Sequence, residues 1–142
     1  MTSITPFLWF DTQAEEAAKF YCSVFARSQI TGTTAGPGGR PMTVSFELDG
    51  QQFIALNGGP RCKFSEATSF VITCKDQHEI DHYWSQLTAG GGEESMCGWL
   101  KDKYGLSWQV IPAALGELLG SPAAVHAMMK MRKLDIAALR AA

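Results

Sequence analysis

The stretch HEIDH at residues 78–82 contains the residue types whose spacing most directly suggests chemistry. Two histidines one helical turn apart, with a glutamate between them, are typical of zinc peptidases, in which the glutamate activates a metal-bound water. The apolar stripe of the same predicted helix lies on the opposite side from both histidines and consists of Ile80, Tyr83, Trp84 and Leu87. The remaining histidine, His126, is in the C-terminal tail, and no third ligand is evident. We therefore interpret the pattern as a coincidence on a solvated helix face.

Three glycine clusters invite comparison with phosphate-binding loops, at residues 36–39, 57–60 and 89–92. A nucleotide loop follows a strand and opens a helix, so that the helix N-terminus meets the phosphate. The third cluster instead follows a predicted helix and precedes a strand, which is typical of a helix C-cap and connector. The first strand is likewise followed by no glycine loop of the kind that a Rossmann-type methyltransferase needs, and no G-x-S-x-G elbow is present.

The elements that would position any site form a unit that occurs twice. The first copy predicts a strand at residues 4–10 and a helix at 12–25, with Thr12 and Glu15 at capping-box spacing. Three further strands are then predicted, at residues 29–34, 42–48 and 51–56.

The second copy repeats this order, with a strand at residues 68–74 and a helix at 76–87 that carries a capping box at Asp76 and Glu79. Its three later strands are predicted at 93–96, 99–103 and 106–111, and Gly50 and Gly105 mark equivalent hairpin turns in the two copies. Each βαβββ module exposes one face of its sheet, so two modules should pair to bury it.

The chain has 142 residues, enough for one domain with a substantial core. We expect a single domain with module 1 at about 1–60, module 2 at about 66–112 and a helical tail at 113–142, in which Ser121 and Asp135 begin helices. The Met-rich stripe of the tail favours a subunit or inter-module contact.

Apolar residues make up 46% of the chain and charged residues 18%, and the formal net charge is −2. No basic stripe indicates a nucleic-acid partner, and no apolar run is long enough to span a membrane. The first residues lack the features of a secretory signal, so we expect a cytoplasmic protein. The four cysteines never form C-x-x-C, which favours reduced thiols over disulfides or a zinc ribbon.

The doubled module resembles the vicinal oxygen chelate superfamily of glyoxalases, extradiol dioxygenases, fosfomycin-resistance enzymes and bleomycin-binding proteins. The stretches ITPFLWFD, AEEAAKFY, ALNGGP, CGWLKDKYGLSWQVIP and, in the tail, MKMRKLDIAAL are similar to the PhnB-like branch, often labelled 3-demethylubiquinone-9 3-methyltransferase. The resemblance implies an α+β fold in which the two modules pair into a cup-shaped mixed sheet. It also implies metal ligands, His or Glu, on the first and last strands of the modules.

The chain departs from that ligand pattern. Residues 4–10 and 68–74 contain no His, Glu or Asp, and Gln109 stands where the resemblance places a ligand glutamate. A neutral amide is a poor ligand for Zn²⁺, Ni²⁺ or Fe²⁺. We therefore expect no metal site and no cofactor.

Neighbouring residues of a strand point to opposite faces, so alternation predicts which side chains line the cup and which pack on the helices. The predicted helix-facing residues are Leu8, Phe10, Trp108 and Val110. An apolar, aromatic cavity with a few polar groups is typical of a small-molecule site. Filling of the sheet's concave side or of a dimer interface is the alternative. The predicted ligand-binding residues are Phe7, Trp9, Asn57, Cys97, Trp99, Ser107 and Gln109.

These features favour a metal-independent, dimeric protein that binds a small, partly aromatic or hydrophobic molecule, with its catalytic activity and catalytic residues open. One alternative is a metal-dependent lyase, isomerase or dioxygenase of the same superfamily. Another is an interaction protein with a filled cup, and a weaker one is the methyltransferase of the family label.

Overall fold

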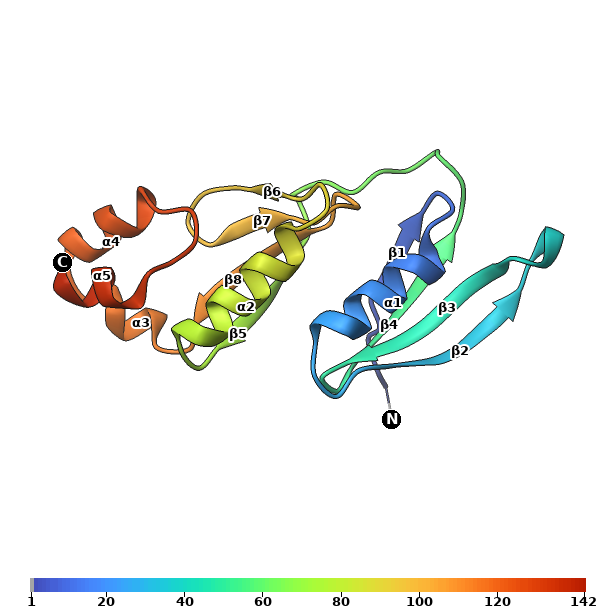
Figure 1. The fold of residues 1–142 in the computed structure, drawn as a ribbon, viewed down its shortest axis with the longest axis horizontal. Helices are drawn as coiled ribbons and strands as arrows, with labels where there is room; N and C mark the ends of the chain where they lie inside the picture. The colour runs from blue at the N-terminus through green and yellow to red at the C-terminus, as the bar shows by residue number, and fades with distance from the viewer. Residues whose placement is uncertain (1) are drawn as a thin grey trace. The chain divides into compact units, whose positions relative to one another are not determined.

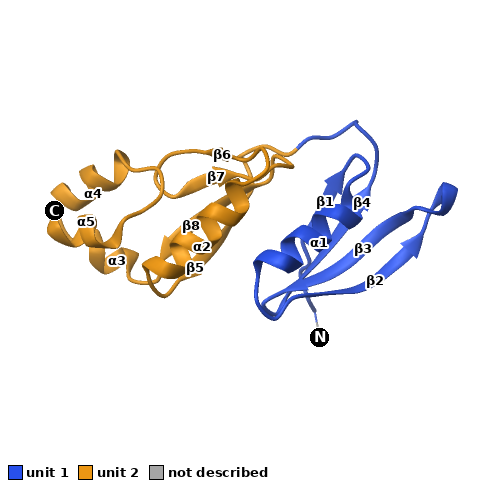
Figure 2. Cartoon of the chain, viewed as in Figure 1, with its two compact units in different colours: residues 1–63 blue, residues 64–142 orange. Residues whose placement is uncertain are grey.

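The computed structural model describes residues 2–142 of the chain, which form two compact units. Unit 1 comprises residues 1–63 and unit 2 residues 64–142 (Figure 2). Unit 1 corresponds to the first predicted module, and unit 2 to the second module together with the tail. Each unit has its own sheet and its own helices (Figure 1).

Unit 1 contains a four-stranded sheet in the order β1-β4-β3-β2, with one helix packed on it. β1 pairs with β4 in parallel, and the other neighbours are antiparallel. The elements are β1 (Phe7–Phe10), α1 (Ala14–Val24), β2 (Gln29–Ala35), a short 3₁₀ turn η1 (Pro37–Gly39), β3 (Pro41–Leu48) and β4 (Gln51–Asn57).

Unit 2 repeats this topology, with strand order β5-β8-β7-β6 and a parallel β5–β8 pair. Its sheet and main helix are β5 (Ser69–Cys74), α2 (Gln77–Thr88), β6 (Glu93–Glu94), β7 (Trp99–Lys101) and β8 (Ser107–Pro112). The tail forms α3 (Leu115–Leu118), α4 (Pro122–Met129) and α5 (Ile136–Ala141). The predicted doubled βαβββ arrangement, the α+β class and the helical tail are confirmed.

The two main helices begin differently. Asp76 caps α2 by accepting a bond from the Glu79 N–H at 3.0 Å, and the Glu79 carboxylate accepts from the Lys75 N–H, so the predicted cap is confirmed. The predicted cap at Thr12 is wrong, because Gln13 precedes α1 and offers no side-chain cap. The Asn57 Oδ1 atom instead accepts the Ala14 N–H at 2.8 Å. A residue at the end of β4 thus replaces a local cap by a tertiary one.

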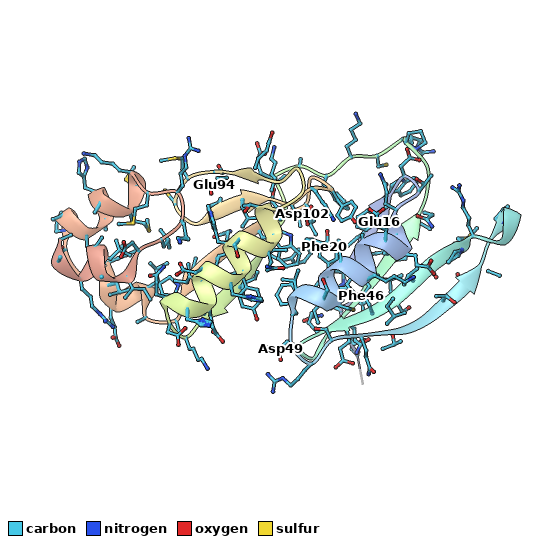
Figure 3. All side chains as sticks on the ribbon, in the orientation of Figure 1. Glu16, Phe20, Phe46, Asp49, Glu94 and Asp102 are labelled. Carbon is cyan, nitrogen blue, oxygen red and sulfur yellow. The ribbon has the colours of Figure 1, made fainter. Side chains whose placement is uncertain are left out.

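The core of each unit lies between its helix and one face of its sheet. In unit 1, Phe46 on β3, labelled in Figure 3, is fully buried. Its ring stacks between Tyr21 of α1 and Phe53 of β4, at centroid distances of 6.1 and 5.4 Å. In unit 2, Trp108 and Val110 of β8 are buried, together with Ile80, Trp84 and Leu87 of α2. The predicted helix-facing positions Leu8 and Phe10 of β1 are buried as well, whereas Tyr83 of α2 is only half-buried.

Alternation leaves the opposite face of each sheet without helix cover, and we call it the open face. Cross-strand register places Trp9 beside Leu56 in unit 1, and Gln109 between Val71 and Trp99 in unit 2. Phe7 is 55% exposed and Val71 is 52% exposed. Within residues 2–142, none of the helices is both long enough and apolar enough to cross a membrane.

Candidate functional site

The polar residues of the HEIDH stretch lie on the solvent-facing side of α2 or in its N-terminal cap. His78 and His82 are exposed, and His82 packs edge-on against Tyr83. Glu79 belongs to the helix cap, and Asp81 forms an ion pair with Lys133 at 2.8 Å. No group of three or more His, Cys, Asp or Glu side chains with metal-binding geometry occurs among residues 2–142. The solvated placement that the sequence predicted for this pattern is confirmed.

A cavity of about 570 Å³ lies in unit 2 along the β6–β7 hairpin and the start of β8. This volume is within the range of small-molecule sites. The cavity combines apolar and charged lining, and three of the predicted ligand-binding residues contribute to it. They are Cys97, Trp99 and Ser107.

The hydroxyl of Ser107 is the most unusual polar group in this cavity. Ser107 is the first residue of β8 and is 1% exposed, and its Oγ atom has no hydrogen-bond partner among the described residues. A buried hydroxyl without a partner is costly, because folding removes its water and returns no bond.

Charged side chains from β7, β6 and the segment before β5 lie next to Ser107. Lys101 of β7 pairs in register with Ser107 on one side and with Glu93 of β6 on the other. The Lys101 Nζ atom is 3.0 Å from Glu66 Oε2. This hydrogen bond, together with the attraction of the opposite charges, lowers the pKa of the Glu66 carboxyl and raises the pKa of the Lys101 ammonium. Both groups are therefore held in their charged forms at neutral pH.

The outer rim of the cavity is the turn that joins β6 to β7, residues 95–98, which we call the rim turn. Cys97 has φ of +60° and Gly98 has φ of +85°, so two consecutive residues adopt the left-handed conformation. That conformation is uncommon for a residue with a Cβ atom. It needs support from the surroundings.

The other predicted site residues lie outside this cavity. The Gln109 Nε2 atom donates to Ser69 Oγ at 3.0 Å on the open face of unit 2. In unit 1, Trp9 donates from Nε1 to the Gly59 carbonyl oxygen and lies under the Arg61 guanidinium. Phe7 is on the same open face.

Asn57 has both ends of its side-chain amide engaged. Its Oδ1 atom caps α1, and its Nδ2 atom donates to the Pro41 carbonyl oxygen at 2.9 Å. The amide therefore joins β4, β3 and α1, and this structural task accounts for its position. Its contact with a ligand stays a prediction.

The charged lining residues were missed at the sequence level. Strand alternation carries a usable signal for Glu93 and Lys101, which occupy the same face as Trp99 and Ser107. Glu66 lies in the irregular segment before β5, where no periodicity exists, so only the tertiary structure brings it to Lys101.

The open faces do not offer the ligand set that this fold uses for metals. On β1, β4, β5 and β8, where the resemblance implies ligands, the open-face side chains are aromatic, aliphatic, hydroxyl or amide groups. One carboxylate lies on the open face of each sheet, Glu47 on β3 and Glu93 on β6. Divalent transition metals prefer several anionic or imidazole ligands. The residues on these faces therefore do not fit a metal centre.

Duplicated βαβββ modules with parallel outer pairs define a glyoxalase-like fold. The family model described as 3-demethylubiquinone-9 3-methyltransferase matches residues 2–111, and the chain belongs to this family. Among curated proteins, none is similar enough to match.

Solved structures agree with this placement. A putative 3-demethylubiquinone-9 3-methyltransferase, PhnB protein, from Bacillus cereus is 33% identical, with a TM-score of 0.73 over 79% of this chain and 100% of that chain. The fosfomycin resistance protein FosX from Listeria monocytogenes is 14% identical, with a TM-score of 0.57 over 82% and 97% of the two chains. A glyoxalase/bleomycin resistance protein from Albidiferax ferrireducens is also 14% identical, with a TM-score of 0.51 over 78% and 98%. The last two show a shared fold.

Proposed function

We propose that this chain is a metal-independent protein that binds a small molecule with an apolar or aromatic part and a hydrogen-bonding group. The observation that carries this proposal is the unpartnered Ser107 hydroxyl, which is buried at a cavity of about 570 Å³. Trp99 and Met96 supply apolar surface in the same cavity, and Lys101 and Glu66 supply charge. Such a mixture of apolar walls and few polar groups suits a specific small ligand.

The proposed ligand-binding surface also includes the open faces of the sheets. In this proposal Phe7 and Trp9 on the open face of unit 1, and Gln109 on the open face of unit 2, also contact ligand. The exposure of Phe7 and Val71 supports a binding role for the open faces, since exposed apolar patches often mark interaction sites. The protein is a cytoplasmic homodimer in this proposal.

A thermal-shift screen against a metabolite library tests ligand binding, followed by titration calorimetry of each compound that raises the melting temperature. Ser107→Ala and Trp99→Ala should each weaken binding of such a compound about five- to thirtyfold, since the loss of one buried hydrogen bond or of aromatic packing is worth about 1–2 kcal/mol. Thr73→Ala is the matched control, because Thr73 is on the open face of β5 and outside the cavity. A screen without any shifting compound would favour a filled cup.

The metal-dependent lyase, isomerase or dioxygenase is the first competing function. Elemental analysis of protein purified without a histidine tag separates it from the proposed function. We expect transition metal well below one equivalent per chain, because the open-face strands lack imidazole and carboxylate ligands at the implied positions. Stoichiometric metal would overturn metal independence.

Methyl transfer is the second competitor, since it is the activity in the family's description. The β1–α1 and β5–α2 junctions contain no glycine, so neither forms a loop of the type that cradles a nucleotide-like cofactor beside a strand. We expect no S-adenosylmethionine binding in calorimetry at millimolar ligand. A measurable heat of binding with defined stoichiometry would restore this activity.

A further inference from the structure

The tail of unit 2 makes specific contacts with the rim of the cavity. The match to the family model ends at residue 111, so the tail lies beyond it. The connection between α4 and α5 runs beside the β6–β7 turn (Figure 1). We call residues 131–136, which end with the first residue of α5, the clamp.

The clamp binds the backbone of the rim turn directly. The Cys97 N–H donates to the Met131 carbonyl oxygen, and the Gly98 N–H donates to the Arg132 carbonyl oxygen, each at 2.8 Å. These are the two residues with consecutive positive φ angles. Their N–H groups therefore find acceptors in the clamp, outside the sheet ladder, and the left-handed turn is stabilised by residues more than thirty positions later in the chain.

Side-chain packing holds the same contact from the inner side. Leu134 is fully buried, and a Cβ atom added at Gly98 would lie 3.2 Å from its side-chain carbons and 2.9 Å from the Val110 carbonyl oxygen. The rim turn can approach Leu134 and β8 this closely because residue 98 is glycine. Backbone bonds and packing thus fix one geometry of the turn.

The clamp itself is anchored to α2 by one side chain. The Gln77 Nε2 atom donates to the Leu134 carbonyl oxygen at 3.0 Å, and the Gln77 Oε1 atom accepts from the Ile136 N–H at 2.9 Å. Gln77 therefore uses both ends of its amide on the clamp. The ion pair of Lys133 with Asp81 adds a second, more exposed link to the same helix.

Building on the ligand site proposed above, we propose that the clamp completes this site: it holds the rim turn so that Cys97 and Met96 form the cavity wall facing Ser107. Gln77 is the positioning residue of this device and does not touch the ligand. The tail is then a part of the binding site that the family match does not contain.

The test uses Gln77→Ala in the full chain, with Gln86→Ala as the matched control. Gln86 is an exposed residue of the same helix, outside the clamp contacts. Amide hydrogen exchange at Cys97 and Gly98, followed by NMR, is the first readout. We expect exchange at least tenfold faster in Gln77→Ala and unchanged in Gln86→Ala, because loosening of the clamp opens both N–H···O bonds.

The second readout is alkylation of Cys97 by iodoacetamide, quantified by peptide mass spectrometry. Gln77→Ala should raise its rate several-fold, since the rim turn samples open conformations more often. Gln77→Glu should give an intermediate rate, because a carboxylate still accepts the Ile136 N–H but cannot donate to the Leu134 carbonyl oxygen. If the substitutions only weakened α2, Gln77→Ala and Gln77→Glu would raise the alkylation rate to the same extent.

The third readout is the affinity for N-phenyl-1-naphthylamine, a neutral aromatic fluorescent probe, which should fall about tenfold in Gln77→Ala and stay constant in Gln86→Ala. Unchanged exchange at Cys97 and Gly98 would overturn the clamp. Faster exchange with unchanged probe affinity would overturn its part in the site. If the wild-type chain does not bind the probe while exchange and alkylation respond as expected, the clamp stands and the ligand site proposed above is at fault.

Discussion

Units 1 and 2 have the same strand order but differ in the length of two hairpin strands, β2 and β3 in unit 1 and β6 and β7 in unit 2. In unit 1 the hairpin strands β2 and β3 span Gln29–Ala35 and Pro41–Leu48, whereas in unit 2 the corresponding β6 and β7 span only Glu93–Glu94 and Trp99–Lys101. Short strands pair through few ladder bonds, so β6 and β7 need support from other elements. The clamp provides this support, and the cavity lies along the same shortened hairpin. The shorter of the two hairpins is therefore the one that carries both the tail contacts and the cavity.

The turns that enter β4 and β8 show the same divergence. In unit 1, Asp49 is exposed in a two-residue turn and forms an ion pair with Arg27. In unit 2, Asp102 is 3% exposed, and its carboxylate accepts the N–H groups of Tyr104 and Leu106 and the indole N–H of Trp108 at 2.8–3.1 Å. Figure 3 marks both aspartates. An aspartate at the equivalent place thus forms an exposed ion pair in unit 1 and a buried hydrogen-bond network in unit 2.

The largest contrast that we expect between the units is in thiol reactivity. Burial, with a smaller contribution from the charges of Glu79 and Asp76, raises the pKa of Cys74 from the ordinary 9.0 to about 12, whereas Cys62 is exposed. At pH 8 a thiol with a pKa of about 12 contains roughly a thousandfold less thiolate than a thiol with the ordinary pKa of 9.0. Alkylation of Cys74 should be slowed at least in proportion. Time-resolved mass spectrometry of iodoacetamide-treated native protein measures both rates, and comparable rates would contradict the packing of β5.

The same shift gives stability a dependence on alkaline pH. The folded chain keeps the Cys74 proton up to about pH 12, while the unfolded chain releases it near 9.0. The contribution of this group to the free energy of unfolding is therefore complete below about pH 9 and is lost as the pH rises toward 12. Urea titrations at pH 8 and pH 10 check the sign, with Cys74→Ala expected to flatten this part of the profile.

Phe46→Ala tests the core that only unit 1 possesses, the stack of Tyr21, Phe46 and Phe53. Removing a fully buried ring should lower the free energy of unfolding by about 3–5 kcal/mol, because apolar burial and packing are both lost. Hydrogen exchange locates the effect. Protection should fall mainly in α1 and in β1 to β4, and an equal loss in β8 would show that the two units unfold as one.

The two aspartates form a matched pair. Asp102→Asn should cost about 2–3 kcal/mol, since the amide keeps one acceptor and presents N–H groups to a buried donor. Asp49→Asn should cost less than about 1 kcal/mol, because it removes an exposed ion pair and asparagine tolerates the φ of +47° at this position. Urea unfolding of both variants measures the difference, and equal losses would mean that the buried network in unit 2 adds nothing.

The smallest effect that we expect is at Ser107. Because its hydroxyl has no partner among the described residues, Ser107→Ala should leave stability unchanged or raise it by up to about 1 kcal/mol. Thermal unfolding without added ligand measures this, with Ser69→Ala as the comparison, since the Ser69 hydroxyl accepts a bond from Gln109. A loss of 1 kcal/mol or more for Ser107→Ala would show that its hydroxyl is satisfied in the ligand-free protein.

The sequence by itself determined the doubled module, the strand and helix order and the helix-facing residues such as Leu8, Phe10, Trp108 and Val110. These follow from local periodicity, because alternation and the 3.6-residue repeat are written in neighbouring residues. The caps at Asp76 and Asp135 are equally local and were predicted, whereas the cap of α1 by Asn57 was not.

Only the tertiary structure decided which polar groups meet. The Lys101–Glu66 pair, the capture of the rim turn by Met131 and Arg132, and the unpartnered state of the Ser107 hydroxyl each join segments that no periodicity relates. Hydrogen bonds between distant segments depend on backbone geometry at the level of tenths of an ångström, and the pattern of apolar and polar residues does not encode that geometry. The face on which Ser107 lies was predictable from its strand, but the cavity beside it was not.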